Sequence, residues 1–437
     1  MSETTLTFGE LIKSGMISVT DGYRAKNSEL GGTGLIFLRA GHVTDAYIDF
    51  GDVERFHGEL TPMLQEKTSR VGDVIVTTKG NSTGRTSFVD ATMPTFVYSP
   101  HLSRWRVEDK NKVNAAFLRY WSRSPQFVNQ MRGLAASTDM APYLSLRDQQ
   151  RLEITLPHID AQCAIGTVLG SLDDKIEQNR RTGRALEGLA RATFKAWFVD
   201  FEPVKAKAAG AAGFPGMPPG AFAAVPDRLT DSPLGPVPEG WAVGTMGDLL
   251  KERGERVTPG DETRRLPYVP IDCITSKRVT LETFKSGEEA QSSLIRFQDG
   301  DILFGAMRPY FHKVCLAPFS GTTRTTCFVL VPRTDSDRAF ALMLASEPAT
   351  VQFATTHSVG STIPYAKWQS SLHEMQCFLP PEVLRAAFGM FADSLLHLSN
   401  QTVRESAKLA TLRDYLLPRL LSGEVRVVQP QSEEEPS

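Results

Sequence analysis

Both halves of this sequence carry loops whose cations, amides and hydroxyls are suited to contact with DNA. Arg and Lys bind phosphates and guanine edges, Asn and Gln pair with adenine, and Ser and Thr serve either purpose. The candidate DNA-binding residues of the first half are Tyr23, Arg24, Lys26, Asn27, Arg39, His42, Lys79, Asn81, Ser82, Thr83 and Arg85. Those of the second half are Arg256, Thr258, Lys277, Arg308, Tyr310, His312, Lys313, Arg324 and Thr325. One such loop alone is typical of an ordinary polar surface, but their occurrence at equivalent places in both halves favours a function.

Small polar residues also precede a Pro-Tyr pair in each half. They are Ser137 and Thr138 before Pro142-Tyr143, and Ser361 and Thr362 before Pro364-Tyr365. Such residues contact a backbone phosphate or cap the segment that follows, and the sequence favours neither interpretation over the other.

The sequence contains no recognisable catalytic constellation. An adenine methyltransferase needs a Gly-rich loop after a strand and an Asn/Asp-Pro-Pro-aromatic loop for the flipped base, and neither motif is present. Residues 80–86 lack the lysine and the spacing of a P-loop. Two acidic patterns, Glu108–Lys110 and Asp173–Lys175, are interpreted as a solvated turn and a charged helix face rather than a nuclease site. The histidines are dispersed, so we predict no catalytic and no metal-binding residue, which favours a binding or scaffolding role.

Two long helices are expected to position these loops. Steps of alternately four and three residues meet mostly apolar side chains from Ile165 to Trp197, and again from Leu384 to Leu416. The first stretch would be roughly 50 Å long as a helix, so it needs a partner along its length. The polar or small residues midway along the two seams are Asn179, Gly183, Thr402 and Glu405. We therefore predict an antiparallel coiled coil formed within one chain.

An internal repeat predicts two copies of one unit, each a mixed α/β domain followed by a long helix. Phe8-Gly-Glu-Leu11 returns as Met246-Gly-Asp-Leu249, and Gly72-Asp-Val-Ile75 returns as Gly300-Asp-Ile-Leu303. The offset between equivalent residues settles at 222 to 223 from Ser124 onward, whereas earlier loops differ in length. The fold class predicted from this repeat is α+β. The expected boundaries are 1–158 and 241–380 for the domains, 159–201 and 381–423 for the helices, 202–240 for a Pro/Ala/Gly-rich linker without a packed core of its own, and 424–437 for an acidic tail.

Composition restricts the class of protein further. The formal net charge of the 437 residues is −2, so no global basic field indicates a nucleic-acid partner, although local basic faces remain compatible with it. The five cysteines are scattered without a CxxC pair, which is typical of reduced thiols in a cytoplasmic protein. The polar start lacks a signal peptide, and no apolar stretch is long enough to span a membrane.

Taken together and in order, several motifs resemble one family: the specificity subunit of type I restriction-modification systems. The motifs are Phe37-Leu-Arg-Ala-Gly41, Gly72-Asp-Val-Ile75, Ile176-Glu-Gln-Asn-Arg-Arg181, Phe194-Lys-Ala-Trp-Phe-Val-Asp-Phe201, Pro226-Asp-Arg-Leu229, Pro238-Glu-Gly-Trp241 and Leu417-Pro-Arg-Leu-Leu-Ser-Gly-Glu424. The resemblance implies a bacterial or archaeal protein with two target-recognition domains, each reading one half of a split duplex DNA site, and two helices that fix the gap between the halves.

The resemblance also implies partners that carry the chemistry. Two methylation subunits would bind S-adenosylmethionine and methylate adenine, and motor-nuclease subunits would use ATP and Mg, so that no cofactor is expected in this chain. Two alternatives from other classes stay open on the sequence alone. One is a coiled-coil adaptor protein without DNA specificity, and the other is a self-sufficient DNA methyltransferase or nuclease.

Overall fold

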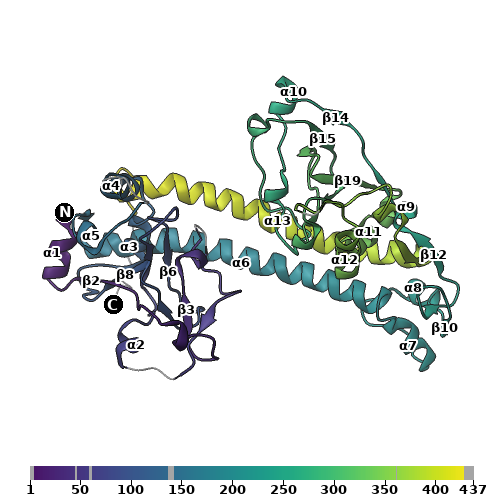
Figure 1. Ribbon diagram of the computed structural model, residues 1–437, viewed down its shortest axis with the longest axis horizontal. Coiled ribbons are helices and arrows are strands. Elements are labelled where there is room, and N and C mark those ends of the chain that lie inside the picture. Colours follow the sequence, from purple (N-terminus) through teal and green to yellow (C-terminus); the bar gives the residue numbers. More distant parts are fainter. Residues whose placement is uncertain (1–3, 45–46, 59–61, 136–141, 361, 428–437) are drawn as a thin grey trace, which may run out of the picture. The chain divides into compact units, whose positions relative to one another are not determined.

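The computed structural model describes residues 4–44, 47–58, 62–135, 142–360 and 362–427. The chain divides into two compact units, the first made of residues 1–176 and 408–437 and the second of residues 177–407. Two helices of 40 residues, α6 (Ile159–Phe198) and α13 (Glu382–Leu421), each contribute to both units and lie side by side (Figure 1). The fold is therefore α+β, with two mixed α/β regions and two long packed helices, as predicted.

The first unit is built on a four-stranded antiparallel sheet in the order β2-β8-β5-β6. A three-stranded sheet in the order β4-β3-β7 and a two-stranded sheet, β1-β9, complete it. Its strands are β1 (Thr4–Thr7), β2 (Ile17–Asp21), β3 (Ile36–Leu38), β4 (Glu54–Arg55), β5 (Val74–Thr77), β6 (Thr86–Phe88), β7 (Phe96–Tyr98), β8 (Leu102–Val107) and β9 (Glu153–Leu156). Its short helices are α1 (Phe8–Lys13), α2 (Pro62–Glu66), α3 (Ala115–Trp121), α4 (Pro125–Ala135) and α5 (Leu146–Gln149).

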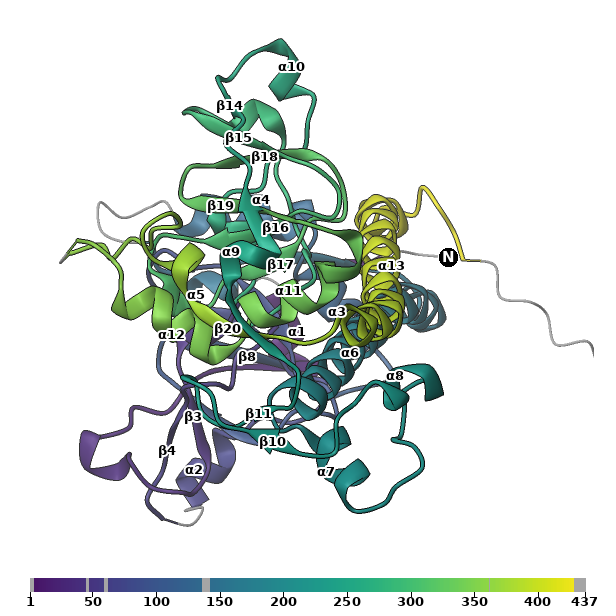
Figure 2. The same cartoon turned by 90° about the vertical axis from the view of Figure 1, so that its right-hand side faces the viewer.

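The second unit repeats this plan with an antiparallel sheet in the order β13-β19-β16-β17, a sheet β14-β15-β18 and a pair β12-β20 (Figure 2). Its strands are β10 (Leu229–Thr230), β11 (Val237–Pro238), β12 (Ala242–Thr245), β13 (Leu250–Glu252), β14 (Arg256–Val257), β15 (Leu294–Phe297), β16 (Ile302–Gly305), β17 (Val314–Leu316), β18 (Gly321–Arg324), β19 (Cys327–Pro332) and β20 (Gln376–Leu379). Its short helices are α7 (Glu202–Ala208), α8 (Pro219–Ala223), α9 (Met246–Leu249), α10 (Asp261–Arg264), α11 (Arg338–Ala345) and α12 (Pro348–Thr356).

The strand orders confirm the internal repeat, and matching turns show how each copy is built. Gly72 and Gly300 precede β5 and β16 with φ of +97° and +86°, a conformation that favours glycine. The next residue, Asp73 or Asp301, accepts a hydrogen bond from a main-chain amide three residues earlier, at 2.8 and 2.7 Å. The three-stranded sheets differ, because β3 pairs with β7 in parallel whereas β15 pairs with both neighbours antiparallel. This difference falls where the sequence offset between the copies still drifts.

The helix pair is antiparallel in the second unit. The Asn179 amide on α6 donates to the Glu405 carboxylate on α13 at 2.8 Å. Further along α6, the Gly183 carbonyl accepts a hydrogen bond from the Ser399 hydroxyl, which lies earlier on α13. The partner residue on α13 therefore moves backward as the residue on α6 moves forward. In the first unit, Asp173 on α6 contacts Arg413 on α13 at 2.7 Å.

The predicted seam of α13 is partly wrong. Leu398 and Leu412 were expected to be buried, yet their side chains are 47% and 45% exposed, while Leu396 and Ser399 are buried instead. A straight helix repeats every 3.6 residues rather than 3.5, so a strict heptad drifts away from the contact face. Small residues also allow close approach: a Cβ on Gly183 of α6 would lie 3.2 Å from Ser399 Oγ.

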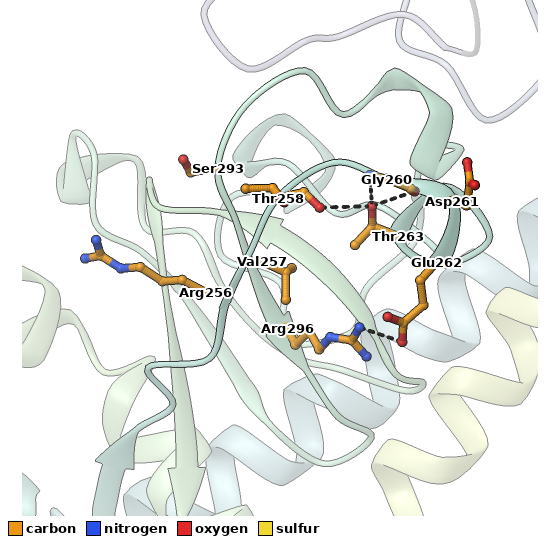
Figure 3. Close-up of a pocket in the computed structure, with 9 residues that line it drawn as sticks. All are labelled: Arg256, Val257, Thr258, Gly260, Asp261, Glu262, Thr263, Ser293 and Arg296. Carbon is orange, nitrogen blue, oxygen red and sulfur yellow. Dashed lines mark hydrogen bonds and ion pairs between the residues drawn. The ribbon is translucent and has the colours of Figure 1, made fainter.

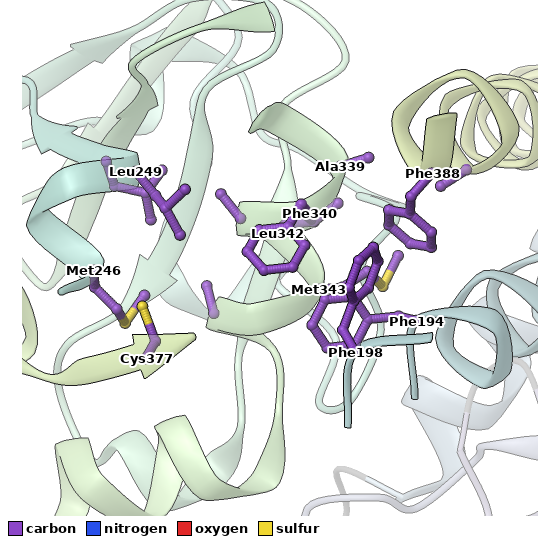
Figure 4. Packing of buried hydrophobic residues seen from close by; sticks show 14 of the residues in the cluster. Phe194, Phe198, Met246, Leu249, Ala339, Phe340, Leu342, Met343, Cys377 and Phe388 are labelled. Atoms are coloured by element: carbon purple, nitrogen blue, oxygen red, sulfur yellow. The ribbon is translucent and has the colours of Figure 1, made fainter. Parts of the chain in front are cut away.

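Aromatic side chains join the helices to the α/β core of the second unit (Figure 4). Phe194 and Phe198 of α6 pack against Phe340 of α11 with ring centroids 5.5 and 5.0 Å apart, and Phe194 also packs against Phe388 of α13 at 5.7 Å. Burial of such large apolar groups is the main stabilising contribution to a core of this kind.

The segment 202–240 differs from the semi-extended linker expected from its composition. It contains α7, α8 and the β10-β11 pair, and its Val204, Met217 and Phe222 are buried in the same core as Phe198. Lys207 Nζ also donates to the Ala223 carbonyl at 2.9 Å. Local hydrogen bonds and apolar anchors therefore fold this proline-rich stretch onto the second unit.

Three large aromatic side chains, those of Trp105, Tyr120 and Trp121, are fully buried in the first unit. The five cysteines are all free. Among the described residues, no helix combines the length and the apolar character required to cross a membrane.

Candidate nucleic-acid interface

The predicted basic loop of the first unit is a hairpin turn between β5 and β6 that is closed by its own hydrogen bonds. Gly80 and Gly84 have φ of +87° and +88°, and the Thr83 hydroxyl donates to the Gly80 carbonyl at 2.7 Å. The Thr77 hydroxyl donates to the Ser82 carbonyl. Backbone and hydroxyl groups thus fix the turn, and the Lys79, Asn81 and Arg85 side chains are exposed on it.

The same loop is joined to the Pro142-Tyr143 segment, which the sequence treated as a separate candidate. The Gly80 amide donates to the Pro142 carbonyl at 3.1 Å, and Thr83 Oγ1 donates to the same oxygen at 2.9 Å. Lys79 pairs with Tyr143 in an isolated β-bridge. Two sequence-predicted loops therefore form one surface, although Ser137 and Thr138 lie outside the described residues.

The second unit makes the equivalent junction. The Arg308 amide donates to the Pro364 carbonyl at 2.8 Å, and Met307 pairs with Tyr365. The Tyr365 hydroxyl donates to the Thr325 carbonyl, which adds a further predicted residue to the junction. Burial, with smaller contributions from Cys327 and Glu252, raises the pKa of Tyr365 to about 12, so this hydroxyl remains a donor at neutral pH. Thr362 is exposed beside it, and Ser361 lies outside the described residues.

Residues 23–42 contribute a second group on the first unit, next to β3. The Tyr23 hydroxyl donates to Glu29 at 2.8 Å, which raises the pKa of the tyrosine. Arg39 forms an ion pair with Glu54 at 2.5 Å and lies 5.0 Å over the Phe37 ring. The His42 ring nitrogen Nδ1 accepts the Arg39 amide at 3.1 Å. Tyr23, Arg39 and His42 therefore shape their own loops, while the exposed residues between them are Arg24, Lys26 and Asn27.

Two predicted residues of the second unit point inward. Lys313 Nζ donates to the Ile271 carbonyl at 2.9 Å, and His312 Nε2 donates to the Ser346 carbonyl at 2.7 Å. Burial lowers the pKa of His312, and the positive charges of Arg191 and Lys277 lower it further. These two side chains are half-buried and their hydrogen bonds hold the loop. Their predicted role in DNA binding stays a prediction.

Arg256 and Thr258 line an open pocket of about 470 Å³ in the second unit (Figure 3). Arg296, which the sequence analysis missed, lies in the same pocket and forms ion pairs with Glu262 at 2.6 Å and Glu255 at 3.2 Å. Figure 3 shows the Arg256 guanidinium pointing away from Glu262. The remaining predicted cations are both exposed, Lys277 on another loop and Arg324 at the end of β18.

The interpretation of Asp173–Lys175 as a plain charged helix face is also corrected. Asp174 is exposed, but the Asp173 side chain is 10% exposed and is held by Arg119 and Arg413 at 2.7 Å each. Arg119 of α3 and Arg413 of α13 could have indicated this ion cluster in the sequence. They cannot be paired with Asp173 until it is known which helices pack together. Within the described part of the chain, no group of three or more His, Cys, Asp or Glu residues could hold a metal ion.

The comparisons with known proteins agree on one family. No family model matches the chain. The chain is 25% identical over 333 residues to the specificity subunit of the type I restriction enzyme MjaIX of Methanocaldococcus jannaschii, which covers 73% of this chain and 71% of that protein. It is 22% identical over 438 residues to the HindI specificity subunit of Haemophilus influenzae, covering 87% of this chain and 94% of that protein.

A solved structure shows the same fold. The crystal structure of the type I restriction-modification S subunit from M. genitalium covers 96% of both chains with a TM-score of 0.58 at 14% sequence identity. The duplicated α/β plan, the antiparallel helix pair and the two curated relatives converge, and the chain belongs to the specificity subunits of type I restriction-modification systems.

Proposed function

We propose that each α/β domain of this chain reads one half of a bipartite duplex DNA site, and that α6 and α13 set the number of base pairs between the halves. As a specificity subunit, the chain is the non-catalytic component that recognises the DNA target within a type I complex.

The observation that carries the proposal is the equivalent junction in the two domains. In each copy, the loop after the central strand donates a main-chain amide to the carbonyl of the Pro-Tyr segment. The side chains presented there differ between the copies: Lys79, Asn81 and Arg85 in one, and Arg308 and Tyr310 in the other. One backbone with two sets of recognition groups is what two unlike half-sites require.

The spacer role is supported by the continuity of the two helices. Each helix runs through 40 residues and serves both units, so its length is roughly 60 Å. Paired helices resist bending more than a single chain segment does, because side chains interlock along the seam. A rigid pair would hold the two domains at one separation.

We further propose that two methylation subunits and the motor-nuclease subunits supply the chemistry, with S-adenosylmethionine, ATP and Mg bound there. Leu189 of α6 and Leu412 of α13 occupy equivalent positions in the repeat, and they are 49% and 45% exposed. A half-exposed leucine at the same place on each helix supports two equivalent docking faces, one for each methylation subunit.

The test is selection from a randomised duplex library by the chain assembled with its methylation partner. Recovery of two fixed motifs separated by a constant gap is the expected result. Enrichment of no motif would instead support the adaptor alternative. Cleavage or methyl transfer by the purified chain alone would support a self-sufficient enzyme.

A further inference from the structure

Backbone strain in the described chain is concentrated at one loop cluster of the second domain. Four described residues other than glycine have positive φ, and three of them, Lys277, Arg308 and His312, lie together with φ of +59°, +52° and +53°. A side chain in this left-handed region costs free energy that glycine would avoid. Such conformations persist where the surrounding structure imposes them, and they gather at functional sites.

Hydrogen bonds hold this cluster from three sides. The Ser276 hydroxyl donates to the Phe311 carbonyl at 2.7 Å, and the Lys277 amide donates to the His312 carbonyl at 2.8 Å. The Arg308 amide donates to the Pro364 carbonyl at 2.8 Å. The loop is therefore fixed before any ligand arrives, which lowers the entropic cost of binding.

The fixed loop presents two large aromatic side chains to solvent. Tyr310 and Phe311 are 50% and 46% exposed, and their ring centroids lie 4.8 Å apart at an interplanar angle of 55°. Two adjacent exposed rings form a contiguous apolar patch, and exposed apolar patches mark binding sites more often than single exposed residues do. Neither ring is required for the hydrogen bonds that fix the loop, because those bonds use main-chain groups and the Ser276 hydroxyl.

The position and charge of the loop identify the partner as duplex DNA. The loop is the structural equivalent of residues 79–85 in the first domain, where cations and an amide occupy the same junction. Cations also flank the aromatic pair here, with Lys277 exposed and Arg308 at the start of the turn. Aromatic faces stack on bases and cations contact phosphates, so this combination of rings and cations suits a nucleic-acid partner.

We infer that Tyr310 and Phe311 form an aromatic wedge that contacts the bases of the second half-site at a locally unstacked step. This inference rests on the proposed function and assigns the readout of one half-site to stacking rather than to polar side chains. Apolar side chains of this kind insert between stacked base pairs, and the free energy of unstacking depends on the base step. The sequence preference at the second half-site would therefore depend partly on how easily the DNA deforms.

The experiment uses the full chain assembled with its methylation partner and the duplex recovered by selection. Affinities are measured for that duplex and for one with the second half-site scrambled. The test variant carries Tyr310→Ala and Phe311→Ala. A matched control is Phe284→Ala, which removes a ring that is 57% exposed elsewhere in the same unit. The exchange variant Tyr310→Phe with Phe311→Tyr keeps both rings.

The double alanine variant should lose about tenfold or more of its preference for the intact second half-site, while discrimination at the first half-site is retained. The Phe284→Ala and exchange variants should discriminate as the unmodified complex does. With 2-aminopurine placed in the second half-site, the unmodified and exchange complexes should raise its fluorescence at one step, and the double alanine complex should not.

Full discrimination and full fluorescence by the double alanine variant would overturn the inference while leaving the proposed function intact. In another outcome, the double alanine variant assembles poorly with the methylation partner, while the complex that does form discriminates normally between the two duplexes. That result would overturn the inference and identify the two rings as a protein-binding patch. If the unmodified complex showed no preference for any bipartite site, the proposed function and the inference would fall together.

Discussion

The Asp173 carboxylate is the hub of an ion cluster that joins α3, α6 and α13 within the first unit. It accepts hydrogen bonds from Arg119 at 2.7 Å, from the Tyr120 hydroxyl at 2.9 Å and from Arg413 at 2.7 Å. Arg123 Nη1 lies 3.7 Å away. Burial opposes ionisation of Asp173, but Arg119, Arg413 and Arg123 together outweigh it and lower the pKa of the carboxyl below its ordinary value.

Replacing Asp173 by Asn should therefore destabilise the first unit. The carboxylate is 10% exposed, and the three guanidinium-bearing side chains are 20%, 22% and 23% exposed. Removing one member of a buried pair costs about 3–5 kcal/mol, whereas an exposed pair is worth at most about 1 kcal/mol. For this partly screened cluster we expect about 2–4 kcal/mol. Asp174→Asn alters the exposed neighbour and should change stability by about 0.5 kcal/mol or less.

Hydrogen exchange of the full chain, followed by mass spectrometry, measures the effect in each unit separately. Peptides from α3 and from residues 408–421 should exchange roughly 30- to 1,000-fold faster in Asp173→Asn, because each 1.4 kcal/mol corresponds to about tenfold. Peptides from α11 in the second unit should be unaffected. If these peptides exchanged no faster in Asp173→Asn than in Asp174→Asn, the Asp173 ion cluster would not stabilise the first unit.

Acidification provides an independent check on the same residue. The folded pKa of Asp173 is lowered, so its contribution to stability is complete above the unfolded pKa, about 4, and is lost as the pH falls through the folded value. The difference between the unmodified chain and Asp173→Asn should shrink over that range of pH.

Three further predictions concern recognition, spacing and acid sensitivity. Lys79→Ala should weaken binding to the first half-site by about tenfold and leave the second unchanged; equal loss for both halves in a library selection would contradict independent domains. Inserting one heptad at paired positions of α6 and α13 should lengthen the selected gap by about three base pairs with both half-sites retained, and an unaltered gap would exclude the spacer role. Because burial lowers the pKa of His312, its contribution to stability is present above the unfolded pKa, about 6.5, and is lost as the pH falls through the lower folded value. Exchange in α11 and α12 should therefore accelerate on acidification through that range, and His312→Gln should reduce this pH dependence; an unchanged dependence in the variant would assign it to other groups.

The helix pair shows how far patterning predicts the fold. The limits expected for the helices, 159–201 and 381–423, contain the observed α6 and α13, because long amphipathic periods are a strong signal. The contact face of α13 could not be read with the same accuracy. Ser399 is buried because it packs beside Gly183, and a polar residue opposite a glycine carries no apolar signal.

The internal repeat predicted which loops belong to the candidate interface, but not the orientation of their side chains. Equivalent loops in both copies indicated a shared role, and the structure places each of them against the Pro-Tyr segment of its own domain. Which cations face solvent was not predictable. Lys313 and Lys79 were both candidates, yet Lys313 Nζ donates to the Ile271 carbonyl, 42 residues away in the sequence. Only the folded chain identifies such an acceptor.

If the proposed function holds, separate residues form the loops and read the DNA, so that one duplicated fold can serve two half-sites. In the first domain, the loop is fixed by glycines with positive φ and by Thr83 contacts to carbonyls, so Lys79 and Asn81 can change without altering the hairpin. In the second domain, the same junction is fixed by strained residues and main-chain hydrogen bonds, and the exposed positions carry the aromatic side chains of Tyr310 and Phe311. A mutation at such a position would change the chemistry offered to DNA at little cost in stability, since the hydrogen bonds that form the loop do not use that side chain. Specificity could then evolve separately in each domain while the helix pair keeps its length.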